Sequence, residues 1–188
     1  MRGAFHEAFA ARLFIDAQYE IHARPETYVK GQDFDFYVVK DGDRLNVEVT
    51  ALEAKKFSAK TIPNSLNQKR KQLPDTAPAI VFVGIPNEWT NELHDWDAYL
   101  SKVTSDFFRG SQRVNTVIFL AEQIFPIPGI GIVLLMAQKS YIHPRPRMRT
   151  NDMGFLPPQT SELRLARDSE FFRWIDYIVP PMESSDGR

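Results

Sequence analysis

Apolar residues recur at helix and strand spacing along the first half of the chain. The pattern predicts, in chain order, a helix at 3–17, an extended stretch at 18–29 interrupted by Pro25, strands at 33–40 and 43–51, a helix at 61–73 and a strand at 79–85. The last of these is a continuous apolar run between Pro78 and Pro86, which is typical of a buried strand. This order of elements predicts an α/β sandwich with a central sheet.

Helical and extended patterns continue in the second half. We expect a helix at 88–108, a strand at 114–121, a longer strand at 130–142 and a short helix at 168–178. A Pro- and Arg-rich segment at 143–158 reads as a loop, and no repeat or clear linker divides the chain. We therefore expect residues 1–188 to form a single domain.

An Asp-Gly pair at positions 41 and 42 predicts a tight hairpin between the strands at 33–40 and 43–51. A turn there brings apolar residues opposite one another on one face: Phe34 with Val49, Phe36 with Val47, and Val38 with Leu45. A slip of one residue would set Phe36 against Glu48, so the hydrophobic pattern determines the register.

The other face of the hairpin gathers acidic residues. Asp35 lies opposite Glu48 and Asp33 lies opposite Thr50, with facing Cβ atoms about 5 Å apart. Like charges at this spacing repel, and a bound divalent cation such as Mg²⁺ would offset them, because hard cations take carboxylate oxygens. The alternative is a solvated acidic face whose carboxylates pair with Lys or Arg. The apolar neighbours and the helix and strand that follow favour a covered face.

The composition is that of a globular protein. With 43% hydrophobic and 25% charged residues, collagen-like, coiled-coil and disordered classes are excluded. A net charge of −1 excludes nucleic-acid binding through overall basicity, so any such binding must use a local patch. The absence of cysteine excludes disulfides, zinc–cysteine sites and thiol nucleophiles.

No segment of the sequence predicts a membrane association. The first residues carry charges and lack the apolar core of a signal peptide. The longest apolar stretch, from Ile124 to Ala137, is too short to span a bilayer and is broken by prolines and glycines. We therefore expect a cytoplasmic protein.

These patterns resemble the PD-(D/E)XK superfamily, the restriction-endonuclease-like nucleases. Residues 31–36, Gly-Gln-Asp-Phe-Asp-Phe, look like its Asp-bearing strand, and residues 45–50, Leu-Asn-Val-Glu-Val-Thr, look like the strand that usually ends Glu-x-Lys. Residues 3–7, Gly-Ala-Phe-His-Glu, resemble its first-helix motif. The resemblance covers residues 3–86 and implies an αβββαβ core with a mixed central sheet flanked by helices. Residues 87–188 would then be a C-terminal α/β elaboration that completes the sheet and forms a substrate or partner surface.

The resemblance also implies a metal site. It implies Mg²⁺ or Mn²⁺ held by Asp35 and Glu48, with Asp33 and Glu7 as further ligands. We prefer Asp35 to Asp33 because Asp35 faces Glu48, although Asp33 fits the Gly-x-Asp spacing of some family branches. The alternative for Glu7 is an ordinary surface position on its helix.

One position departs from the family pattern. The motif lysine is replaced by Thr50, and a neutral hydroxyl cannot offset developing negative charge. At 100° per residue, Lys69 falls within the apolar stripe of the predicted 61–73 helix, together with Ile62, Leu66 and Leu73. We expect Lys69 to replace the missing lysine. The alternative is a lysine whose stem packs while its ammonium reaches water.

Further polar and basic side chains flank the predicted site. Gln72 at the edge of the stripe, and Lys55 and Lys56 just past the third strand, are auxiliary candidates. Side chains that we expect to contact phosphates are Lys60, Arg70, Arg145, Arg147 and Arg149. The alternatives are solvated basic faces and, for the 143–158 loop, a contact with a partner protein or a second copy.

The leading hypothesis is a metal-dependent nuclease that hydrolyses phosphodiesters of nucleic acid, with DNA favoured over RNA. The alternative is a catalytically inactive pseudo-nuclease that binds nucleic acid or protein, which Thr50 and the neutral overall charge support. A homodimer or a larger protein complex fits either hypothesis.

Overall fold

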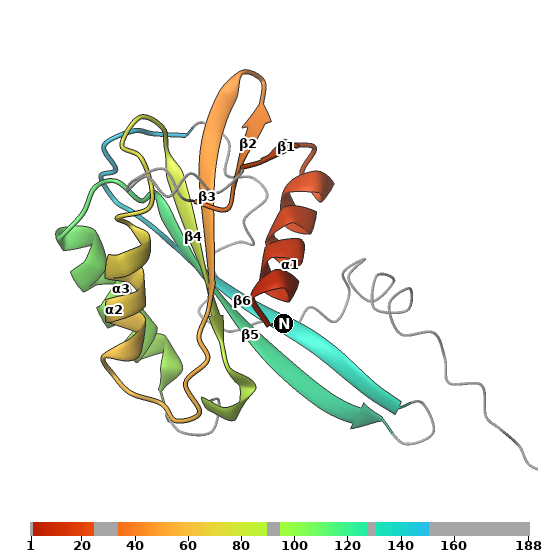
Figure 1. The fold of residues 1–188 in the computed structure, drawn as a ribbon. Helices are drawn as coiled ribbons and strands as arrows, with labels where there is room; N and C mark the ends of the chain where they lie inside the picture. Colours follow the sequence, from red (N-terminus) through yellow and green to blue (C-terminus); the bar gives the residue numbers. More distant parts are fainter. Residues whose placement is uncertain (1, 25–33, 90–94, 128–130, 151–188) are drawn as a thin grey trace, which may run out of the picture.

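The computed structural model describes residues 2–24, 34–89, 95–127 and 131–150. These residues form one six-stranded mixed sheet in the order β1-β2-β3-β4-β5-β6, with helices on both faces (Figure 1). The predicted α/β class with a mixed central sheet flanked by helices is confirmed. The predictions for Asp33 and for a helix at 168–178 lie outside the described residues.

The order of elements follows the predicted order closely. The elements are α1 (Arg2–Asp16), β1 (Glu20–Ala23), β2 (Phe36–Lys40), β3 (Asp43–Ala51), α2 (Thr61–Lys69), β4 (Ala79–Ile85), the 3₁₀-helix η1 (Asn87–Trp89), α3 (Trp96–Arg109), β5 (Thr116–Ile127) and β6 (Gly131–Ile142). Strands β3, β4 and β5 are parallel, and the remaining neighbours are antiparallel. Among the described residues no helix is long and apolar enough to cross a membrane.

The hairpin between β2 and β3 has the predicted turn and most of the predicted register. Asp41 and Gly42 both have positive φ, 52° and 84°, as a type I′ turn requires. Phe36 pairs with Val47 and Val38 with Leu45, as predicted. The pairing ends at Phe36, so the expected pair of Phe34 with Val49 is wrong.

Beyond Phe36, a side chain of the chain leading into β2 takes the place of the backbone hydrogen bonds between β2 and β3. The Asp35 carboxylate Oδ2 accepts a hydrogen bond from the Val49 backbone N–H at 2.6 Å, so this donor is satisfied without a partner strand. Phe34 consequently packs on the opposite side of the sheet from Phe36.

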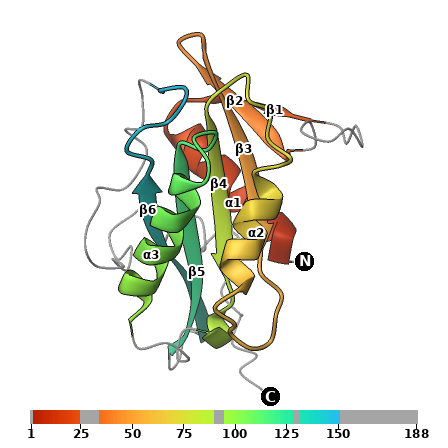
Figure 2. The same ribbon diagram turned by 90° about the vertical axis from the view of Figure 1, so that its left-hand side faces the viewer.

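Two hydrophobic layers hold the sheet between the helices. Side chains of α1 pack with one face of the sheet; this layer includes Phe9, Phe14, Val47, Val49, Phe82 and Leu120. Side chains of α2 and α3 pack with the other face; this layer includes Ile62, Leu66, Leu100, Val81, Val83 and Phe119. Because alternate strand residues point to opposite faces, Asn46, Glu48 and Thr50 lie on the α2 side. Figure 2 shows α2 and α3 side by side in front of the sheet.

Helix α2 is shorter than the predicted helix at 61–73. It ends at Lys69 and is followed by 3₁₀-type hydrogen bonds, in which the N–H group donates to the carbonyl three residues earlier. Lys71 N–H donates to Gln68 O, and Gln72 N–H donates to Lys69 O. Pro74 disfavours a helical conformation for the residue before it, which explains the early end. Leu73 is nevertheless fully buried, so the predicted apolar face is kept.

The predicted boundaries in the second half also shift. Of the expected helix at 88–108, the structure describes η1 and α3, and residues 90–94 lie outside the described part of the chain. Helix α3 begins at Trp96, where the Asp95 side chain accepts a hydrogen bond from Ala98 N–H at 2.8 Å. The expected strand at 114–121 extends to Ile127 as β5. It pairs with β6 along its whole length, which carries the ribbon past the end of β4 (Figure 1).

The contact between α1 and β4 generates a stability prediction. A Cβ atom at Gly84 would lie 2.5 Å from Nε2 of His6, which is buried and cannot move away. We expect Gly84→Ala to lower the free energy of unfolding by about 1–3 kcal/mol in urea denaturation. Gly110→Ala is the control, because its Cβ would meet nothing closer than 3.5 Å. Equal stability of the two variants would contradict this packing.

Candidate active site

Glu48 is a carboxylate in the interior of the sheet. It lies in the middle of β3, beside Val81 of β4, and its side chain is only 1% exposed. Its Oε1 accepts a hydrogen bond from the Lys69 ammonium at 2.5 Å, and the lysine side chain is 22% exposed. A buried carboxylate therefore has one charged partner that still reaches solvent.

The packing of α2 brings Lys69 to this position. Ile62 and Leu66 are fully buried against the sheet, and Lys69 lies three residues after Leu66 on the same face of the helix. Its stem is partly covered, as both predictions for Lys69 require, and its ammonium donates to Glu48. The nearby Lys71 is exposed, so only one of these two lysines approaches the sheet.

Asp35 and Glu7 belong to the same electrostatic cluster. Burial raises the pKa of Asp35, an effect that the Val49 hydrogen bond and the Lys69 charge oppose and the Glu7 charge reinforces. Burial, with the added repulsion of Asp35, raises the pKa of Glu48 to about 8 even though Lys69 acts against this. Glu7 is an exposed residue of α1 that acts on both carboxyls through its charge.

The chemistry of these groups fits a hard divalent cation. Oε2 of Glu48 is buried and has no hydrogen-bond partner within the described part of the chain, so one acceptor remains for a ligand. No three His, Cys, Asp or Glu side chains among the described residues lie close enough to hold a metal together. Magnesium needs only one or two protein carboxylates, because it retains several waters, so Asp35 and Glu48 meet that requirement.

Of the predicted auxiliary residues, Thr50 shares a strand with Glu48, Gln72 follows α2, and the lysines precede α2. Thr50 lies on the same face of β3 as Glu48, two residues further along. Gln72 follows α2, and its Oε1 is buried without a hydrogen-bond partner in the described structure. Lys60 is exposed at the start of α2, about 13 Å from Lys69 along the helix. Lys55 and Lys56 are exposed in the loop between β3 and α2.

Of the predicted phosphate contacts, Lys60 precedes α2, and the four arginines lie toward the other end of that helix. Arg70 Nη1 donates to Gly110 O at 2.9 Å, and Arg147 pairs with Asp75 at 3.1 Å. Arg145 and Arg149 are exposed on the same segment as Arg147. Two of these four arginines thus already have partners within the protein.

Two residues near Glu48 were not predicted as part of a site. Asn46, two residues before Glu48 on the same face, is fully buried, and its Oδ1 accepts a hydrogen bond from Arg44 Nε at 3.1 Å. The period of two along β3 was a signal that could have identified Asn46. The same period places Arg44 on this face too, but its contact with the Tyr37 ring comes from β2 and has no signal in the sequence of β3.

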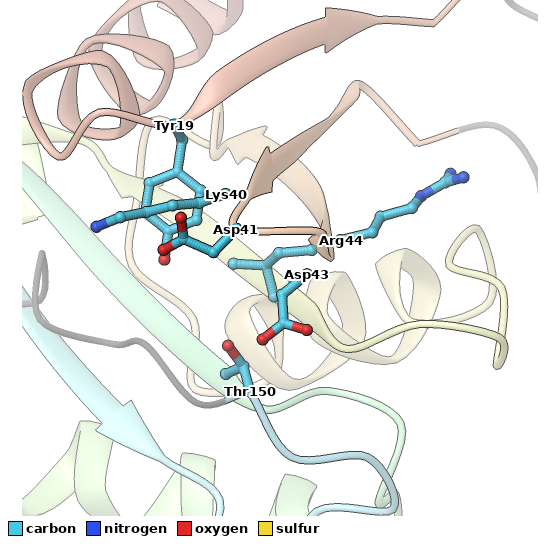
Figure 3. Close-up of a pocket in the computed structure, with 7 residues that line it drawn as sticks. Tyr19, Lys40, Asp41, Asp43, Arg44 and Thr150 are labelled. Carbon is cyan, nitrogen blue, oxygen red and sulfur yellow. The ribbon is translucent and has the colours of Figure 1, made fainter.

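A pocket of about 330 Å³ lies at the turn of the hairpin, away from these carboxylates. It is lined by Tyr19, Asp41, Asp43 and Thr150, among others (Figure 3). In Figure 3 the Arg44 guanidinium points away from the other lining side chains. The pocket contains none of the predicted site residues.

The burial of Glu48 generates a prediction about pH. Its pKa is 4.5 when unfolded and about 8 in the folded protein, so the folded state binds more protons between these values. The stability that Glu48 contributes is complete below pH 4.5 and is lost as the pH rises through about 8. We expect the wild-type Tm to fall over this interval, with a loss of roughly 1 kcal/mol or more, since one pKa unit corresponds to about 1.4 kcal/mol.

Calorimetry of two variants tests the assignment to Glu48. Glu48→Gln cannot titrate and should flatten the Tm profile between pH 5 and 8. Asp106→Asn removes an exposed carboxylate whose pKa is lowered, mainly by its hydrogen bond from Arg109, and should retain the wild-type slope. A wild-type slope in Glu48→Gln would disprove the assignment.

Comparison with known proteins does not identify the chain. No family model matches it, and no curated protein matches it. Among solved structures it is similar to the central domain of yeast acetyl-CoA carboxylase, at 10% identity and a TM-score of 0.38, over 82% of this chain and 26% of that chain. It is also similar to SfsA of Pyrococcus furiosus in complex with Ca²⁺, at 11% identity and a TM-score of 0.34, over 70% of this chain and 59% of that chain. The chain thus spans about a quarter and three-fifths of these two proteins, and neither similarity is close enough to carry an argument about fold family or function.

Proposed function

We propose that the protein is a metal-dependent nuclease of the PD-(D/E)XK type, with a restriction-endonuclease-like core. The observation that carries the proposal is the buried Glu48 paired with Lys69 beside Asp35. The order helix, three strands, helix, strand agrees with such a core. The substrate is nucleic acid, with DNA favoured over RNA.

Asp35 and Glu48 would hold Mg²⁺ or Mn²⁺. The bound ion would supply a Lewis acid and an activated water for attack on a phosphodiester. The protein fixes both carboxylates before any ligand arrives: Asp35 by its hydrogen bond to the Val49 N–H, and Glu48 by its strand position. Asp33 lies outside the described residues and stays a candidate ligand. Glu7 contributes negative charge from α1.

Lys69 would supply the positive charge that the motif lysine supplies elsewhere in the family. Its ammonium lies next to Glu48, so it is placed to stabilise negative charge on a phosphate bound at the two carboxylates. Thr50 lies on the same face of β3 as Glu48, so the vacant family position and Lys69 flank the same carboxylate.

A second candidate function is a pseudo-nuclease that binds nucleic acid without cleaving it. Two observations favour it: Thr50 has no charge, and Lys69 already satisfies one oxygen of Glu48. In that case the ion pair would be a structural replacement for a metal. The two functions differ in whether divalent cations permit cleavage.

Cleavage assays with labelled single- and double-stranded DNA and RNA test the nuclease. We expect wild-type cleavage in Mg²⁺ or Mn²⁺, a loss of roughly 100-fold or more in Asp35→Asn, Glu48→Ala and Lys69→Ala, and no change in Lys71→Ala, the matched exposed lysine. The double variant Lys69→Ala/Thr50→Lys should regain part of the activity, because it restores the cation at the family position.

The outcomes separate the two functions. Cleavage that survives Glu48→Ala would sink the proposed site. Binding of nucleic acid by a wild-type protein that cleaves in neither metal would favour the pseudo-nuclease instead.

A further inference from the structure

Three planar side chains stack on neighbouring strands beside the candidate site. The His22 ring of β1 lies parallel to the Tyr37 ring of β2, with 4.7 Å between centroids and an interplanar angle of 7°. The Arg44 guanidinium of β3 lies over the same Tyr37 ring at 4.0 Å. We call His22, Tyr37 and Arg44 the planar column.

A second stacked pair adjoins the column. The Arg24 guanidinium lies over the Phe34 ring at 4.8 Å, and the Arg44 guanidinium is 6.0 Å from the same ring. Phe34 directly precedes Asp35 in the chain. Two guanidinium groups and three rings thus lie close together, and the buried Phe34 among them is next in sequence to a candidate metal ligand.

The column and the candidate site share one face of the sheet. Tyr37 pairs with Asn46, and Arg44 Nε donates to Asn46 Oδ1 at 3.1 Å. Asn46 is two residues from Glu48, which corresponds to about 6.6 Å along a strand. A polymer bound at Glu48 and running toward the hairpin would therefore meet the column next.

The column is accessible to a ligand. Arg44 is exposed, Tyr37 is partly buried, and the His22 side chain is 33% exposed. In Figure 2 the hairpin end of β2 and β3 extends beyond α2, the helix that carries Lys69. Arg44 and His22, which both stack on the partly buried Tyr37, are therefore the members of the column that a base can reach first.

We propose that the planar column is a stacking platform for unpaired nucleobases, and that the substrate strand is single-stranded where it crosses this face. Guanidinium and aromatic planes bind bases through stacking and cation–π contacts, which tolerate any sequence. A continuous duplex hides the faces of its bases, so it would offer the column only its backbone. The role of the column in cleavage rests on the proposed function, but the binding itself does not.

The charges of the column suit this ligand. Arg24 and Arg44 bring two positive charges to this face, against one negative charge from Glu20, whose carboxylate lies 3.3 Å from His22 Nε2. A chain with net charge −1 needs such a local concentration of cations to bind a polyanion. Stacking would then add the preference for unpaired bases that charge alone does not supply.

Fluorescence anisotropy with the full chain in EDTA tests the platform without any cleavage. The probes are a labelled oligothymidylate of about 20 nucleotides and a blunt duplex of the same length. We expect the single strand to bind about tenfold more tightly than the duplex, and Tyr37→Leu and Arg44→Ala each to weaken single-strand binding by about tenfold. Arg109→Ala, an exposed arginine on α3, is the charge-matched control and should bind as wild type.

Arg44→Lys keeps the charge but removes the plane, so it separates stacking from simple attraction. We expect it to weaken single-strand binding severalfold. Arg44 Nε also donates to the buried Asn46 Oδ1, so the Tm of the variant is measured to verify that it is folded at the assay temperature. Wild-type affinity in Arg44→Lys, or equal affinity for single strand and duplex, would overturn the platform. Selective single-strand binding by a protein that never cleaves would support the platform and refute the nuclease. Cleavage by the wild type that is unchanged in Arg44→Ala would support the nuclease and refute the platform.

Discussion

Glu48 is a carboxylate at the centre of a strand that is hydrogen-bonded on one side to β4 and, up to its neighbour Val47, on the other side to β2. An ionised group in such a place costs several kcal/mol unless it is paired or protonated. The structure meets this cost in two ways: Lys69 donates to Oε1, and the pKa of Glu48 is raised to about 8. The charges of Lys69, Asp35 and Glu7 all act on this single buried group.

The same constraint explains how Asp35 is arranged. A regular ladder would have placed it directly opposite Glu48, where two carboxylates in a covered site repel each other. Instead the strand pairing stops at Phe36, and the Asp35 carboxylate accepts the Val49 N–H. A charge-assisted hydrogen bond to the backbone is among the stronger contacts that a carboxylate can form. This one bond both replaces the β2–β3 pairing beyond Phe36 and holds the Asp35 side chain in place.

The proposed nuclease and its proposed substrate rest on polar and planar side chains of the same face of the sheet. An ion pair beside a second carboxylate favours a site that binds a cation and a phosphate together. The adjacent column of planar groups favours a ligand with flat, unpaired bases. The basic side chains at the end of α2 do not by themselves distinguish these ligands, because Arg70 and Arg147 already bind a carbonyl and a carboxylate of the protein.

Much of this arrangement follows from the sequence alone. The apolar alternation and the Asp41-Gly42 turn determined the register of β2 and β3, because a slip of one residue would bury charges and expose Phe36. The helical period placed Lys69 on the buried face of α2 for a similar reason, since Ile62 and Leu66 have to leave water. The type and order of elements were predictable because each rests on local periodicity and on the positions of proline and glycine.

Only the tertiary structure decided what depends on residues far apart in the chain. Whether Lys69 reached Glu48 or water depended on how closely α2 approaches β3, which no local pattern encodes. The start of β2 at Phe36 depended on the Asp35 side chain accepting a backbone hydrogen bond from β3. The planar column required His22, Tyr37 and Arg44 to come together from three strands, and their contacts exist only once the sheet has formed. Local hydrophobic periodicity thus specified the faces, and long-range packing specified which polar groups meet on them.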